Sequence, residues 1–89
     1  LTVNGDSMID SFIADGDMVL MEPLNDPFRL RNGTIVSAMV PGLGTTLKHF
    51  FRDGSLVRLE AANTSYEPIE IDAEQVHVQG KLAAVWRKT

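Results

Sequence analysis

Short apolar stretches alternate with turn-forming residues along the whole chain, and this pattern predicts a mostly β protein. Turn signals recur about every 8–12 residues, which is typical of β-sandwiches and barrels. Residues 7–13 alone leave room for one or two helical turns. The expected fold is a small β-sandwich or partly open barrel with at most one short helix. Strands are expected at residues 1–3, 18–21, 34–40, 45–51, 56–60, 66–71 and 76–87.

Length and composition fit a single small domain over residues 1–89. The chain has 89 residues, of which 44% are hydrophobic, and this suits one packed core. A net charge of −4 argues against nucleic-acid binding through these residues, because phosphate contacts need clustered Lys and Arg. No apolar run approaches the ~20 residues that span a bilayer, and no signal peptide is visible. Because the chain opens on Leu1 rather than methionine, we expect it to be a piece of a longer protein.

The chemistry of the chain is concentrated in two short motifs. There is no cysteine, which excludes disulfides, a thiolate zinc site and a thiol nucleophile, and suits a reducing cytosol. The first motif is Gly5-Asp6-Ser7-Met8, and the second is Thr46-Leu47-Lys48. A serine in a glycine turn and a lysine in an apolar strand can act as nucleophile and base, because burial disfavours the charged ammonium.

Strand alternation gives the lysine an apolar setting. Thr46, Lys48 and Phe50 should share one face of their strand, and Thr46 is a candidate to orient the lysine amine. Gly5 permits a tight turn that exposes Ser7. At such a turn the backbone N–H groups of Asp6 and Ser7 could form an oxyanion hole, which is a major source of stabilisation in acyl transfer.

Simpler structural interpretations compete with this hypothesis. Ser7 also fits the first position of a capping box, where it would only start a short helix. Lysines in strands usually point to water or protect an edge, so Lys48 could do the same. His49 should face away from Lys48, and we interpret it and His77 as structural. The acidic residues Asp10, Asp15 and Asp17 lack the full ligand pattern of a calcium loop, so turn and cap roles are expected, with no metal and no cofactor.

The order and spacing of several motifs resemble the C-terminal catalytic domain of the LexA family of self-cleaving repressors. In that family the serine of the Gly-x-Ser-Met turn is the nucleophile, which falls on Ser7. The lysine of the Thr-x-Lys strand is the general base, which falls on Lys48. The resemblance covers nearly the whole chain, through residues 3–10, 15–17, 32–36, 46–48, 57–59, 63–66, 68–69 and 80.

The resemblance implies a serine endopeptidase that cuts an Ala-Gly-type bond upstream of this domain in its own polypeptide. It further implies stimulation by a RecA filament on single-stranded DNA, repression of DNA-damage genes, and a cytoplasmic, bacterial location. DNA would be bound only through a helix-turn-helix domain upstream of these residues. Homodimerisation is expected through the last strand, and the residues chosen for that interface are Leu82, Ala84 and Trp86.

Departures from the family pattern leave alternatives open. Residues 1–89 contain no Ala-Gly or Cys-Gly dipeptide and no helix-turn-helix, so the bond to be cut is expected outside them. Residues 23–31 form a longer loop than the family suggests, and Gly44 stands where relatives often have an acidic residue. The alternatives are a UmuD-like polymerase accessory, a phage repressor domain, a type I signal peptidase, and a non-catalytic β dimerisation module. The last of these predicts that Lys48 is exposed and far from Ser7.

Overall fold

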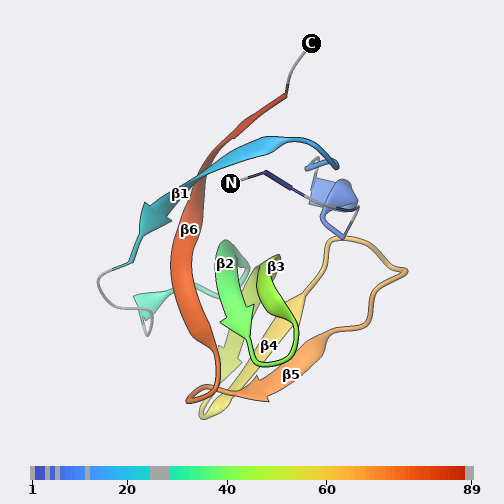
Figure 1. The fold of residues 1–89 in the computed structure, drawn as a ribbon. Coiled ribbons are helices and arrows are strands. Elements are labelled where there is room, and N and C mark those ends of the chain that lie inside the picture. The colour runs from blue at the N-terminus through green and yellow to red at the C-terminus, as the bar shows by residue number, and fades with distance from the viewer. Residues whose placement is uncertain (1, 4, 6, 12, 25–28, 88–89) are drawn as a thin grey trace.

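Six strands and one short helical turn make up the fold, which confirms the mostly β prediction (Figure 1). A computed structural model describes residues 2–3, 5, 7–11, 13–24 and 29–87. The named helical element in this part of the chain is the 3-10 turn η1, and Arg29 also has 3-10 geometry. The elements in chain order are η1 (Ile9–Ser11), β1 (Met18–Pro23), β2 (Thr34–Val40), β3 (Gly44–Asp53), β4 (Leu56–Glu60), β5 (Ile69–Asp72) and β6 (His77–Trp86).

All six strands belong to one antiparallel sheet with the order β1-β6-β2-β3-β4-β5. Hairpins connect β2 to β3, β3 to β4 and β4 to β5, and β6 then returns to lie between β1 and β2. Figure 1 shows that the sheet curves strongly, with the long β6 running from β5 at one end to β1 at the other. Because all six strands lie in one sheet with β1 and β5 as its edges, the arrangement is an open, curved sheet rather than two packed sheets.

Apolar side chains pack on both faces of the central hairpin. One cluster consists of Val36, Ala38, Val40, Phe50, Val57 and Leu59. The second cluster consists of Met8, Ile13 and Val19, and partly buried Ile35 and Leu47 pack against it. Successive residues of a strand point to opposite faces. The hairpin β2–β3 is therefore covered on both sides near residues 35–36 and 47–50, so a polar residue there is removed from water.

Two predicted strands differ from the structure. The strand expected at 66–71 begins only at Ile69, because Asn63 closes a turn just before it. The Asn63 side chain accepts the N–H of Ser65, and its backbone carbonyl accepts the N–H of Tyr66. Of the residues 1–3 expected as a strand, the structure describes Thr2 and Val3, and of these two Thr2 alone pairs with a strand, through an isolated bridge to Met18.

Within the described residues, no helix is long and apolar enough to cross a membrane. The same residues contain no group of three or more His, Cys, Asp or Glu side chains placed to hold a metal ion.

Candidate active site

The structure brings Ser7 and Lys48 together across 41 positions of sequence. The Lys48 Nζ donates a hydrogen bond of 3.0 Å to the Ser7 Oγ. Ser7 comes from the turn that precedes η1, and Lys48 comes from the middle of β3. A serine hydroxyl in direct contact with an amine is the geometry that nucleophile activation needs.

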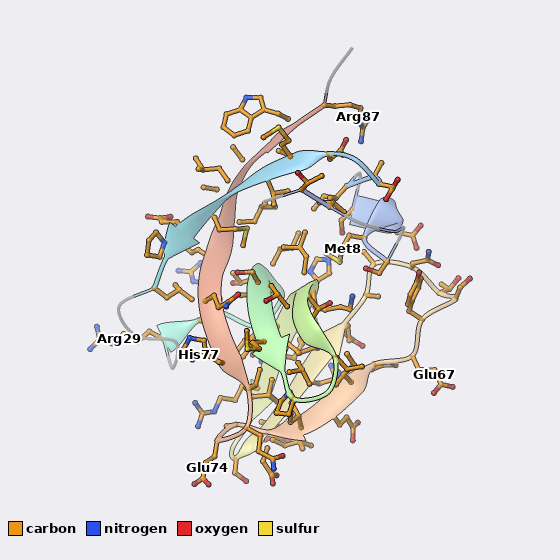
Figure 2. The ribbon with its side chains drawn as sticks, in the orientation of Figure 1. Met8, Arg29, Glu67, Glu74, His77 and Arg87 are labelled. Carbon is orange, nitrogen blue, oxygen red and sulfur yellow. The ribbon has the colours of Figure 1, made fainter. Side chains whose placement is uncertain are left out.

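Local hydrogen bonds and one buried side chain hold the Ser7 turn. Gly5 has a φ of +91°, a left-handed conformation that glycine adopts without strain, and its N–H donates to Asp15 Oδ1 at 2.7 Å. Directly after Ser7, the side chain of Met8 is fully buried in the second cluster. In Figure 2 Met8 lies beside η1. Ser7 is therefore fixed from both sides.

The pairing of β3 leaves space for the Ser7 turn next to Lys48. On one side of β3, Lys48 pairs with Val36 of β2. On the other side, the ladder with β4 begins only at His49, which pairs with Glu60. No described strand therefore occupies the second side of β3 at Lys48, and the Ser7 turn approaches the lysine in this region.

Lys48 is buried, and its surroundings favour the neutral amine. The residue is only 8% exposed, and its strand neighbour Phe50 and cross-strand neighbour Val36 belong to the first apolar cluster. Removal from water lowers the pKa of Lys48 below its usual value of 10.5. The centre of the Tyr66 ring lies 5.9 Å from Nζ, a weak contact that by itself favours the ammonium and so opposes the effect of burial. No carboxylate among the described residues forms an ion pair with Lys48 to counteract this effect.

A surface hollow adjoins the serine and provides a route by which a peptide could reach it. Thr45, Thr46 and Leu47 of β3 form one wall, so the chain segment that ends at Lys48 also borders this space. The hollow is lined by Thr2, Val3, Ser7, Met8, Thr45, Thr46 and Leu47.

The auxiliary roles predicted for Thr46 and Asp6 stay predictions. Thr46 borders the hollow beside Ser7, but no hydrogen bond between Thr46 and Lys48 is found in the described part of the chain. Asp6 lies outside the described residues, so the proposed oxyanion hole of the Asp6 and Ser7 amides is not located by the structure.

Residues predicted to be structural do have structural contacts. The two ring nitrogens of His49 bond to Ser11 Oγ and to the Gly33 carbonyl, so this ring is held away from the Ser7–Lys48 contact. Figure 2 shows His77 along β6, far from Met8 and η1. The Asp15 carboxylate caps the Gly5 amide, and the Asp17 carboxylate accepts the Ala14 N–H.

An ion pair that the sequence analysis missed supports the same region. Arg87 Nε and Nη2 donate to the two oxygens of Asp17 at 3.0 and 2.9 Å. Hydrogen bonding to Arg87 has the largest effect on the buried Asp17 carboxyl. Together with the bond from the Ala14 N–H, it holds the pKa of Asp17 below its usual range. The Asp17 carbonyl also accepts the Val3 N–H, so the residue after β6 is linked through Asp17 to the segment that leads into the Ser7 turn.

The geometry differs from what one alternative predicts. A non-catalytic module was expected to have Lys48 exposed and distant from Ser7, whereas the lysine is buried and bonded to the serine. A solvent-facing lysine is excluded by the same observations.

Comparison with known proteins gives the family. Residues 1–83 match the family described as Peptidase S24-like. The chain belongs to this family. Members of the Peptidase S24-like family are, in general terms, serine peptidases. The match spans the Ser7 turn and the whole of β3, so both halves of the candidate site lie within it.

Sequences of LexA repressors are similar to this chain over nearly its full length. The LexA repressor of Koribacter versatilis (strain Ellin345) is 46% identical over 88 residues, covering 99% of this chain and 40% of the relative. The LexA repressor of Erythrobacter litoralis (strain HTCC2594) is 47% identical over 88 residues, covering 99% of this chain and 36% of the relative. The LexA repressor of Clostridium novyi (strain NT) is 38% identical over 88 residues, covering 99% of this chain and 41% of the relative. The chain thus spans about two fifths of the length of the curated relatives it matches.

Proposed function

We propose that this chain is the self-cleaving serine endopeptidase domain of a LexA-like repressor, with Ser7 as nucleophile and neutral Lys48 as general base. The single observation that carries the proposal is the 3.0 Å contact between Ser7 Oγ and the Nζ of a buried lysine. Membership of the Peptidase S24-like family and similarity to proteins named LexA repressor support it.

The chemistry follows from the protonation state of Lys48. A neutral amine accepts the Ser7 hydroxyl proton while Oγ forms a bond to the carbonyl carbon of the peptide. The resulting ammonium then returns that proton to the departing amine as the C–N bond breaks. Water, deprotonated by the same lysine, hydrolyses the acyl-enzyme and restores Ser7. The hollow beside Ser7 is where the peptide would lie.

The substrate in this proposal is an Ala-Gly-type bond upstream of Leu1 in the same polypeptide. A RecA filament on single-stranded DNA would promote cleavage, and an upstream domain would bind operator DNA. The protein would act in the bacterial cytoplasm as a repressor of DNA-damage genes. These elements rest on the resemblance to LexA-like proteins and on the names of the relatives.

A dimer would form through the outer face of β1 and β6. Met18 pairs with Trp86 and Leu20 with Ala84, so these four side chains share one face. Trp86 is 57% exposed and Met18 is 55% exposed, which is unusual for such large apolar side chains. Within the described elements, residues 82–86 of β6 pair with β1 alone, which leaves their other edge available. Leu82, the third residue predicted for this interface, packs instead against the second apolar cluster.

Self-cleavage of the intact protein, with any sequence upstream of Leu1, tests the proposal across neutral to alkaline pH. We expect the rate to rise with pH as Lys48 loses its proton, and Ser7→Ala to abolish it. Ser55→Ala changes an exposed serine in the β3–β4 turn and serves as the matched control.

The rate should be independent of protein concentration, because the bond and the active site belong to the same molecule. Cleavage that survives Ser7→Ala would contradict the assignment of the nucleophile. Cleavage that needs no RecA filament at neutral pH would remove that partner from the proposal while leaving the peptidase chemistry intact.

A further inference from the structure

A second hydrogen-bonded pair lies directly beside the proposed catalytic pair. Ser11 Oγ and His49 Nε2 are 2.9 Å apart, and His49 Nδ1 is 3.0 Å from the Gly33 carbonyl oxygen. Ser11 is the last residue of η1, His49 follows Lys48 in β3, and Gly33 precedes β2. The bridge therefore joins three separate parts of the chain.

The donor and acceptor roles in this bridge follow from chemistry. A backbone carbonyl can only accept, so His49 Nδ1 must carry the proton that it shares with Gly33. In the neutral ring Nε2 is then an acceptor, and the Ser11 hydroxyl donates to it. Gly33 has a φ of +93°, and its own N–H donates to the Phe50 carbonyl at 2.7 Å. The carbonyl that orients His49 is therefore itself fixed to β3.

The two serine contacts hold β3 from opposite faces. Lys48 and His49 are consecutive in the strand, so their side chains point to opposite sides. Ser7 reaches the first and Ser11 reaches the second. The segment 7–11 therefore passes from one face of β3 to the other, across the edge that has no described strand partner before His49. Its first and last residues are each bonded to β3.

We propose that His49 and Ser11 are positioning residues for the catalytic pair, because their bond sets the place of the Ser7 turn against Lys48. This inference rests on the proposed function of Ser7 and Lys48. His49 touches neither the serine oxygen nor the lysine amine, so its effect is indirect. A displacement of about 1 Å in a reacting group can lower a rate about 100-fold, so a small shift of this segment would matter.

The rest of the segment keeps its attachments when the bridge is removed. The Asp10 N–H donates to the Ala62 carbonyl at 2.7 Å, and Met8 and Ile13 stay buried in the second cluster. Loss of the Ser11–His49 bond should therefore leave a folded protein with a looser Ser7 turn. This separates a positioning role from a role in folding.

The test compares Ser11→Ala and His49→Phe with two control variants, Ser55→Ala and His77→Phe. Ser55 is exposed in the β3–β4 turn, and His77 is exposed at the start of β6, far from Met8 and η1 in Figure 2. Two quantities are measured for each variant: self-cleavage rate of the intact protein, and titration of Lys48 followed by its side-chain ¹³Cε NMR signal. We expect the first two variants to cleave about 10-fold more slowly or worse. Lys48 should also titrate at higher pH in them, because water reaches the amine. The two control variants should match the unchanged protein.

The conservative variant His49→Gln sharpens the test. Its side-chain carbonyl can still accept from Ser11, so it should retain more activity than His49→Phe. Ser11→Ala and His49→Phe proteins could melt at lower temperature but keep the cleavage rate and the Lys48 titration of the unchanged protein. That result would overturn the inference and leave the proposed function standing. If the unchanged protein does not cleave at all, the proposed function fails, and the Lys48 titration alone still decides whether the bridge positions the pair.

Discussion

Two lysines flank the same residue of the sheet and have opposite environments. Val36 of β2 pairs with Lys48 of β3 on one side and with Lys81 of β6 on the other. Lys48 is 8% exposed and bonded to a serine hydroxyl. The Lys81 side chain is 43% exposed, and its Nζ lies 3.7 Å from a carboxylate oxygen of Glu22. Both lysines pair with the same residue, Val36, so the difference in their exposure comes from what lies on the far side of β3 and of β6.

On the far side of β6 is β1, and it places Glu22 directly opposite Lys81. Such an exposed cross-strand ion pair contributes little to stability, about 0–1 kcal/mol. On the far side of β3 the Ser7 turn approaches Lys48 in place of a strand, and apolar side chains complete the burial. In the proposed mechanism Lys48 can serve as a base because its partner is a hydroxyl, where Lys81 has a carboxylate.

The largest expected effect comes from replacing each lysine by arginine, a side chain that carries the positive charge but cannot lose its proton and act as a base. Arginine cannot lose its proton in a protein, so Lys48→Arg should lower the self-cleavage rate by at least about 100-fold. Lys81→Arg keeps the pair with Glu22 and should cleave like the unchanged protein. The rates are followed by gel electrophoresis at alkaline pH. An active Lys48→Arg protein would remove the distinction between the two lysines.

The strand that carries Lys48 and the apolar face that the lysine shares could be predicted from the sequence. Alternation placed Lys48 and Phe50 on one face, and turn residues gave the bounds of β2 and β4. The meeting of Ser7 with Lys48 depends on a contact across 41 positions. Strand patterns carry no information on such a contact, and the family resemblance alone predicted it.

Other details also depend on contacts that a single strand pattern does not contain. Tyr66 was expected in a strand, but the Asn63 turn keeps it out, and the centre of its ring instead lies 5.9 Å from the Lys48 amine. Leu82 was predicted at the dimer interface, which stays a prediction; the pairing between β1 and β6 shifts register after Leu20, and the Leu82 side chain packs against the second apolar cluster. A register shift depends on both strands, so the pattern of one strand could not reveal it.

The second prediction concerns the β1–β6 end, where the exposed apolar face should act in association rather than catalysis. Trp86→Asp places a charge at the proposed interface and should weaken the dimer by more than about 10-fold, as loss of a central aromatic contact commonly does. Leu43→Asp is the control, because Leu43 is equally exposed in the β2–β3 turn. Sedimentation of both proteins over a range of concentrations measures the effect. An unchanged Trp86→Asp dimer would place the interface elsewhere.

The smallest expected effect is on stability, and it also separates the two lysines. A buried lysine with a lowered pKa binds fewer protons in the folded state than in the unfolded state. Stability therefore rises with pH from the lowered pKa of Lys48 up to the usual lysine value of 10.5. Below this window the folded protein bears the cost of a desolvated ammonium. Lys48→Met removes that cost, and the partly exposed Ser7 hydroxyl can bond to water instead.

Lys48→Met should accordingly be more stable than the unchanged protein at neutral pH, by about 0.5–2 kcal/mol, the range typical when a strained functional residue is replaced. The advantage should shrink as the pH approaches 10.5, because the unchanged protein then folds with a neutral lysine. Lys81→Met should stay within about 0.5 kcal/mol, as exposed substitutions usually do. Urea unfolding at one protein concentration and several pH values measures all three proteins. A Lys48→Met protein that is less stable at neutral pH, or whose advantage does not vary with pH, would mean that Lys48 bears no desolvation cost and has no reason to be neutral.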